Sequence, residues 1–281
     1  MDIRMKNEPF TIGFSFILFN LFTFCASPKE NESNIKDSIE ITMNGDSSAI
    51  ADTTYEYFST EKPILENDSF LTYRVNPQKQ NLQLYYKDDK GNVLGCIEYL
   101  QKWVETKNQQ LVFAMNGGMY MEGGRPLGLF IQNYKTITPI NKKSAKGANF
   151  YAKPNGVFYI DSNNVAAICK TEDFVNTGNI KYATQSGPML LFNGEINTIC
   201  NPNSTSIAIR NGVGILPDNE VIFVLTSKDV SFYEFMNYFK RVGCKDALFF
   251  DGNVSIAYLP EKNWKHYGGD FRVMVGVTAN R

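Results

Sequence analysis

Four short segments of the sequence place polar or charged side chains next to apolar stretches and, in most cases, beside glycine. They are Asn116-Gly117-Gly118, Ser186-Gly187, Arg210 and Asp251-Gly252. Turn-rich segments at strand ends are favourable places for function, because a rigid sheet holds the reacting groups while solvent still reaches them. We therefore treat these four segments as candidates for a single site.

Arg210 and Asp251 carry the charges of this group. A guanidinium is a planar fork of donors that fits two phosphate oxygens and keeps its charge at any working pH. A carboxylate that follows the apolar run 247–250 is partly desolvated, which raises its pKa toward the range useful for proton transfer unless a cation lies nearby. Each residue also has an ordinary alternative role. Arg210 could be a surface arginine paired with a carboxylate, and Asp251 could cap a turn with Gly252.

The two neutral segments offer hydrogen bonds rather than charge. Glycines after Asn116 would let backbone amides approach a ligand, although an isolated Asn-Gly-Gly is more often a plain turn. Ser186 could be a nucleophile, but His266, the single histidine of the chain, lies in the polar stretch 262–270, and no nucleophile-elbow pattern is present. We expect His266 at the surface or at the rim of the site.

Short and often alternating apolar stretches predict the strands that position these segments. They cover 71–75, 82–86, 111–115, 129–131, 156–160 and 189–192, with a long hairpin of 207–216 and 221–226 around the turn-forming residues 217–220.

Two helices are also predicted. One follows the capping box Ser231 and Glu234 and ends at Gly243, and the other covers about 96–107. Few helices and many strands, without regular alternation, predict an α+β fold: a single domain with mixed or antiparallel sheets and a few packed helices.

The N-terminus has the order of an export signal. Arg4 and Lys6 precede the apolar run 10–24, which is shorter than the roughly 20 residues of a membrane span and is followed by Cys25. We expect a removed signal peptide over 1–24, lipidation at Cys25, a polar disordered tether over 25–52 and a folded domain over 53–281. Phe24 departs from the small residue usual before a lipidated cysteine. An ordinary secreted protein cut nearby, or a signal kept as an anchor, therefore stays an alternative.

The charge balance and the cysteines argue against several kinds of site. The chain has 28 basic and 29 acidic residues, a net charge of −1 and no basic run in its folded part, so nucleic acid is a poor partner. No cluster of carboxylates or histidines has metal spacing, and we propose neither a metal nor another cofactor. One disulfide could form in an exported chain, with no pairing chosen. The cysteines other than Cys25 form no Cys-x-x-Cys pair; they are Cys96, Cys169, Cys200 and Cys244.

Five motifs in order resemble the phosphodiester glycosidase family, whose members include an N-acetylglucosamine-1-phosphodiester alpha-N-acetylglucosaminidase and bacterial envelope proteins. The motifs are NGGMY, KPNGVFYID, QSGPML, SIAIRNGVG and GCKDALFFDGNVS. The resemblance covers about 55–277 and is densest over 111–255. It implies a hydrolase that releases a sugar from a sugar-1-phosphodiester. The N-terminal signal and Cys25 add the expectation of an exported, membrane-anchored lipoprotein that faces the periplasm or the cell surface.

The resemblance also implies roles for individual residues. Arg210 would hold the phosphate, and Asp251 would act as acid/base or nucleophile. Glu122 is our candidate for a second catalytic carboxylate because it closely follows the NGGMY loop, and Glu195 and Asp270 are weaker candidates. The expected substrate-binding residues are Asn116, Gly117, Gly118, Ser186, Gly187 and Gly252.

A different class of function uses the same residues. A lipoprotein could hold an anionic glycan in this site without cleaving it. Only the enzyme needs Asp251 for turnover, so this residue separates the two hypotheses.

Overall fold

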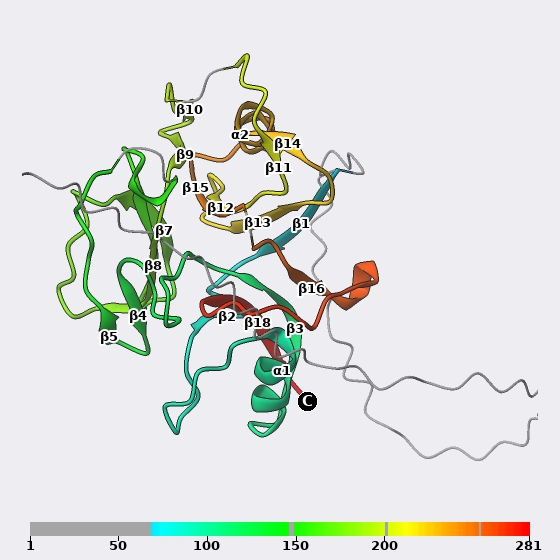
Figure 1. The fold of residues 1–281 in the computed structure, drawn as a ribbon. Helices are drawn as coiled ribbons and strands as arrows, with labels where there is room; N and C mark the ends of the chain where they lie inside the picture. The colour runs from blue at the N-terminus through cyan, green and yellow to red at the C-terminus, as the bar shows by residue number, and fades with distance from the viewer. Residues whose placement is uncertain (1–68, 146–148, 200–201, 253) are drawn as a thin grey trace, which may run out of the picture. The chain divides into compact units, whose positions relative to one another are not determined.

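The computed structural model describes residues 69–281, except 146–148, 200–201 and 253. The predicted signal, Cys25, the tether and Cys200 lie outside these residues. All of the described residues belong to one compact unit, drawn in colour in Figure 1. Within this part of the chain, no helix is long and apolar enough to cross a membrane.

Most of the predicted strands are confirmed, with bounds shifted by one or two residues. The segment 71–75 lies in β1 (Phe70–Val75), 111–115 lies in β3 (Gln109–Asn116), and β9 (Met189–Phe192) has the predicted bounds. Alternation identifies such strands because successive side chains point to opposite faces of a sheet.

The strands of the described residues form three larger sheets and one two-stranded ribbon, and every ladder is antiparallel. One sheet has the order β1, β13 (Val221–Thr226), β12 (Asn211–Ile215), β15 (Asp246–Asp251), β9, β10 (Glu195–Ile196). The second has the order β17 (Trp264–Lys265), β16 (Ala257–Leu259), β3, β18 (Met274–Asn280), β2 (Asn81–Tyr85). The third has the order β5 (Lys135–Thr138), β4 (Phe130–Gln132), β8 (Ile180–Ser186), β6 (Gly156–Asp161), β7 (Ala166–Lys170).

The predicted long hairpin is confirmed only in part. Strands β12 and β13 pair across the predicted turn, but Ile207–Ala208 forms a separate strand, β11, that pairs with β14 (Val230–Ser231). The break lies at Arg210, whose backbone N–H donates to the side chain of Thr226 (2.9 Å) instead of to a ladder carbonyl. A side-chain acceptor of this kind interrupts a ladder, so the pairing with β13 stops there and the residues before Arg210 pair with β14.

Both predicted helices are confirmed. They are α1 (Ile97–Glu105) and α2 (Phe232–Arg241), and two short 3-10 turns cover Asn149–Tyr151 and Pro260–Lys262. Both hydrogen bonds of the capping box at Ser231 are present. Helix α2 packs against one face of β15, so this strand is covered on both sides. That double burial explains why its residues 247–250 are apolar without alternation.

The fold class differs from the α+β expectation. The described residues contain far more strand than helix, with only two α-helices among them, so the domain is predominantly β with antiparallel sheets. Hydrophobic periodicity identified both helices and many strands one at a time, but it missed others, among them β8 and β18. It did not show that sheet packing, rather than helix packing, supplies most of the core.

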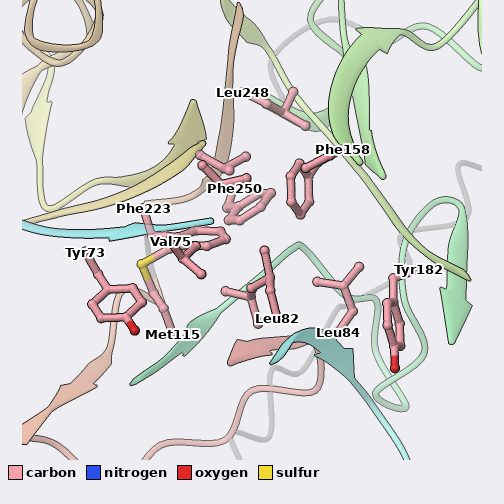
Figure 2. Packing of buried hydrophobic residues seen from close by; sticks show 14 of the residues in the cluster. Tyr73, Val75, Leu82, Leu84, Met115, Phe158, Tyr182, Phe223, Leu248 and Phe250 are labelled. Atoms are coloured by element: carbon pink, nitrogen blue, oxygen red, sulfur yellow. The ribbon is translucent and has the colours of Figure 1, made fainter. Parts of the chain in front are cut away.

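The central core joins the three larger sheets through aromatic side chains. The ring of Phe223 in β13 stacks on Phe113 in β3 (centroids 5.4 Å apart) and meets Phe158 in β6 edge-on (6.1 Å). Phe158 also contacts Phe250 in β15 (6.3 Å), and Figure 2 shows Phe158, Phe223 and Phe250 close together. Because these buried rings lock the sheets together, they fix the ends of β3, β8, β12 and β15 relative to one another.

Candidate active site

The ends of three strands meet where the sequence predicted a site. Asn211, the first residue of β12, lies opposite Asp251, the last residue of β15. The side chain of Asn211 donates to the Oδ1 atom of Asn116, the last residue of β3 (2.7 Å). Asn116, Arg210 and Asp251 therefore come from neighbouring strand ends although they are far apart in the sequence.

Asn116 and Asn211 form a buried pair of amides that holds the loop after Asp251. Asn116 Oδ1 accepts the backbone N–H of Ile256 (3.1 Å), and its Nδ2 donates to the carbonyl of Val254. Asn211 Nδ2 also contacts Ser255 Oγ (3.1 Å). Because its amide is already bound to protein groups, Asn116 positions the loop in this structure, and its predicted contact with substrate stays a prediction.

Asp251 is half-buried, and the protein holds its backbone from two sides. Its N–H donates to Asn211 Oδ1 (3.1 Å), and its carbonyl accepts from Ser255 Oγ (3.3 Å). The carboxylate Oδ1 accepts the N–H of Gly252 (2.7 Å). A carboxylate fixed in this way at a strand end has the orientation that acid/base or nucleophilic chemistry requires.

The glycines of the NGGMY loop allow close packing against β18, the residue before it and β8. The N–H of Gly117 donates to the carbonyl of Val273 (2.8 Å), so this amide is already bound. A Cβ atom on Gly117 would lie 3.0 Å from the backbone nitrogen of Val275, and one on Gly118 would lie 2.6 Å from Thr184 Oγ1. Close packing therefore explains why both positions are glycine, without any need for a ligand.

Ser186 lies beside Asp251 but is not an accessible nucleophile. It is fully buried, and its Oγ donates to the carbonyl of Phe250 (3.0 Å). A Cβ atom on Gly187 would lie 2.6 Å from Cβ of Asn155, so close packing explains this glycine too. His266 is exposed, as expected, with its ring 5.2 Å from that of Trp264.

Arg210 is buried rather than open to solvent, with 2% of its surface exposed. Its Nε donates to the carbonyl of Val230 (2.9 Å), and its Nη2 donates to the carbonyl of Ser206 (3.1 Å). The guanidinium also stacks on the ring of Phe232 at 3.8 Å from the centroid. These contacts fix the cation next to the strand end that carries Asn211.

The three candidates for a second carboxylate lie in different surroundings. Glu122 is exposed in a turn closed by the hydrogen bond from Met121 N–H to Arg125 O (2.9 Å). Glu195 is exposed and forms an ion pair with Lys240 (3.1 Å) on α2. The backbone carbonyl of Asp270 accepts the hydroxyl of Tyr120, whose pKa is also raised by the charge of Asp251, so Asp270 shares this neighbour with Asp251.

Tyr120 connects Asp251 with two charged residues that the motifs did not single out. Its hydroxyl donates to the carbonyl of Asp270. Burial raises the pKa of Tyr120, and the negative charges of Asp270 and Asp251 raise it further. The positive charge of Arg272 acts on this pKa in the opposite direction. Tyr120 therefore keeps its proton at neutral pH and can donate hydrogen bonds in this group.

Sequence reasoning missed four residues around Asp251, and each left a small signal. Three of them lie inside the quoted motifs, as the last residue of NGGMY, the asparagine of SIAIRNGVG and the last residue of GCKDALFFDGNVS. Arg272 stands out as a charge between two buried apolar residues. The four are Tyr120, Asn211, Ser255 and Arg272.

In the part of the chain that the structure describes, no three His, Cys, Asp or Glu residues group in a way that could hold a metal.

Comparisons with known proteins agree with the resemblance of the motifs. The chain is 37% identical over 208 residues to the uncharacterized protein YigE of Escherichia coli K12. The aligned region covers 73% of this chain and 80% of YigE. Its fold is similar to the catalytic domain of zebrafish N-acetylglucosamine-1-phosphodiester alpha-N-acetylglucosaminidase, with a TM-score of 0.53 over 76% of this chain and 84% of that one. At 13% identity, that likeness shows the fold alone.

A family model adds the identity of the domain. The model for phosphodiester glycosidases matches residues 109–278, which include β3, the loop after it, Arg210 and Asp251. The match covers more than half of the chain and all five motifs. The chain therefore belongs to the phosphodiester glycosidase family.

Proposed function

We propose that this protein hydrolyses a sugar-1-phosphodiester in the cell envelope and releases the sugar. The observation that carries the proposal is Asp251, a half-buried carboxylate at the end of a buried strand whose backbone is fixed by Asn211 and Ser255. Membership of the phosphodiester glycosidase family supports the reaction class.

One well-placed carboxylate suits this reaction. Hydrolysis adds water across the bond between sugar and phosphate, and the proton and hydroxide of that water end on the two products. A phosphate is already a good leaving group and needs little protonation, so the demand for a second carboxylate is weaker than in other glycosidases. Asp251 would accept the proton of the attacking water or attack directly, while a nearby cation stabilises the charge on the departing phosphate.

Incubation of the protein with a panel of sugar-1-phosphodiesters, including UDP-sugars, tests this function. The reaction is run in ¹⁸O-labelled water, and the label is located by mass spectrometry. Label in the sugar reports cleavage of the carbon–oxygen bond, whereas label in the phosphate reports cleavage of the phosphorus–oxygen bond. Binding of these compounds without any release of sugar would instead favour the non-catalytic glycan-binding lipoprotein.

We also propose that the domain is held at a membrane through lipid on Cys25. The apolar run 10–24 and the cysteine that follows it support this location. In cells given a labelled fatty acid, the Cys25→Ser variant should lose the label and move from the membrane to the soluble fraction. Equal labelling of both proteins would contradict lipidation at this residue.

A further inference from the structure

Arg272 lies between the buried residues Phe271 and Val273, just before β18, and its side chain reaches the turn after the NGGMY loop. A Cβ atom on Gly124 in that turn would lie 2.8 Å from Nε of Arg272 and 3.2 Å from its Cζ. The absence of a side chain at Gly124 therefore leaves the space in which the guanidinium lies. The Arg272 side chain is 31% exposed, so part of this cation faces solvent.

The protein uses little of the hydrogen-bonding capacity of Arg272. Its Nη2 forms an ion pair with Asp270 Oδ1 (2.9 Å), and the side chain of Asp270 is 75% exposed. Its Nε atom is buried and, among the described residues, has no hydrogen-bond partner. A guanidinium has five N–H donors and exposed ion pairs are weak, so the Nη groups, rather than the buried Nε, are the donors that a phosphate would take. In contrast, Arg210 is buried, with Nε and Nη2 bound to backbone carbonyls.

Arg272 and Asp251 share Tyr120 as a neighbour. Its neighbour Val273 accepts the N–H of Gly117, and its partner Asp270 accepts the hydroxyl of Tyr120 through the backbone carbonyl. The charges of Asp251 and Arg272 both act on Tyr120. One tyrosine therefore lies within electrostatic reach of the proposed catalytic carboxylate and of this arginine.

We propose that Arg272 is a substrate-binding residue whose guanidinium, positioned by Gly124 and Asp270, binds the phosphate of the substrate. This inference rests on the proposed function for the identity of the ligand. It assigns the phosphate to a partly exposed cation on the Tyr120 side of Asp251. Arg210 then acts mainly by fixing the strand end at Asn211.

Two glycines of one turn supply a matched pair of variants. Gly123 (φ +83°) and Gly124 (φ +77°) both have a left-handed backbone, so alanine strains both positions alike. Only the Gly124 substitution places a methyl group against Arg272, because no atom lies within 4 Å of a Cβ on Gly123. Gly124→Ala therefore displaces the guanidinium, and Gly123→Ala controls for the strain.

The experiment measures hydrolysis of a UDP-sugar and, by calorimetry, the affinity for inorganic phosphate. We expect Arg272→Ala to lower kcat/KM about 100-fold and to weaken phosphate binding about tenfold. Arg272→Lys and Gly124→Ala should each lower kcat/KM about tenfold, because a lysine lacks the planar fork and a displaced arginine loses its alignment. Gly123→Ala and Arg281→Ala, which removes an exposed ion pair with Glu105, should stay within about twofold of the wild type.

The two readouts separate this inference from the proposed function. If the wild type hydrolyses the UDP-sugar and Gly124→Ala matches Gly123→Ala while Arg272→Lys is unimpaired, the role of Arg272 is wrong and the function stands. If the wild type hydrolyses nothing but binds phosphate in a way that Arg272→Ala abolishes, the function fails and the phosphate site stands. If the wild type does not bind phosphate, the inference is overturned. Should Arg272→Ala fail to fold, the lysine variant and the glycine pair decide.

Discussion

Replacing Asp251 with asparagine should lower the kcat for hydrolysis of a UDP-sugar about 10³-fold while leaving its affinity for the protein almost unchanged. A carboxamide cannot act as a base or nucleophile, which explains the loss of turnover. It keeps the size of the side chain and an oxygen that can accept the N–H of Gly252, which explains the retained binding. Kinetics and calorimetry on the same preparation would measure both effects.

The control for this variant is Asp89→Asn, which removes a carboxylate from an exposed ion pair with Lys107. Such pairs contribute little, so we expect wild-type kinetics. An Asp251→Asn protein that loses binding and activity to the same degree would contradict a catalytic role and indicate that the carboxylate supports the structure of the site. Full activity of this variant would remove Asp251 from the mechanism.

Replacing Asn211 with alanine should destabilise the protein by about 2–4 kcal/mol and lower kcat/KM about 10- to 100-fold. Asn211 is fully buried, and its loss leaves Asn116 Oδ1 with fewer donors and the N–H of Asp251 without its acceptor. Buried polar groups without partners are costly, and the cost is shared across a network. The loop that carries Ser255 would then hold Asp251 less firmly, so the carboxylate is oriented less well.

Urea unfolding monitored by circular dichroism gives the stability change, and two further variants identify its cause. Asn176→Ala changes an exposed asparagine and should cost less than about 0.5 kcal/mol. Asn211→Asp keeps an acceptor for the N–H of Asp251 but removes the donor to Asn116 and Ser255 and adds a buried carboxylate opposite Asp251, so a loss as large as that of Asn211→Ala would show that the donor side of this amide matters most. Stability equal to that of the wild type in Asn211→Ala would show that the two amides do not support the site.

Local features were predicted well because they depend on residues close together in the chain. The capping box at Ser231 depends on side chains three residues apart, and the strand before Asp251 depends on a short apolar run. The hairpin was predicted too long because the interruption at Arg210 depends on Thr226, which lies on the other strand. The balance between α+β and predominantly β depended on how three sheets pack around Phe223, which no local pattern contains.

By itself, the sequence determined both helices, many of the strands, the positions of Asn116, Arg210 and Asp251 at or beside strand ends, and, through its motifs, the phosphodiester glycosidase family. Only the tertiary structure decided which of these side chains are buried or already hydrogen-bonded to other protein groups. It bound the amide of Asn116 to the loop after Asp251, buried Arg210 against Phe232, and brought Arg272 to the Tyr120 side of the site. The physical reason is that hydrogen-bond partners and burial are set by the register and packing of strands distant in sequence, whereas propensity and periodicity report only on neighbours along the chain.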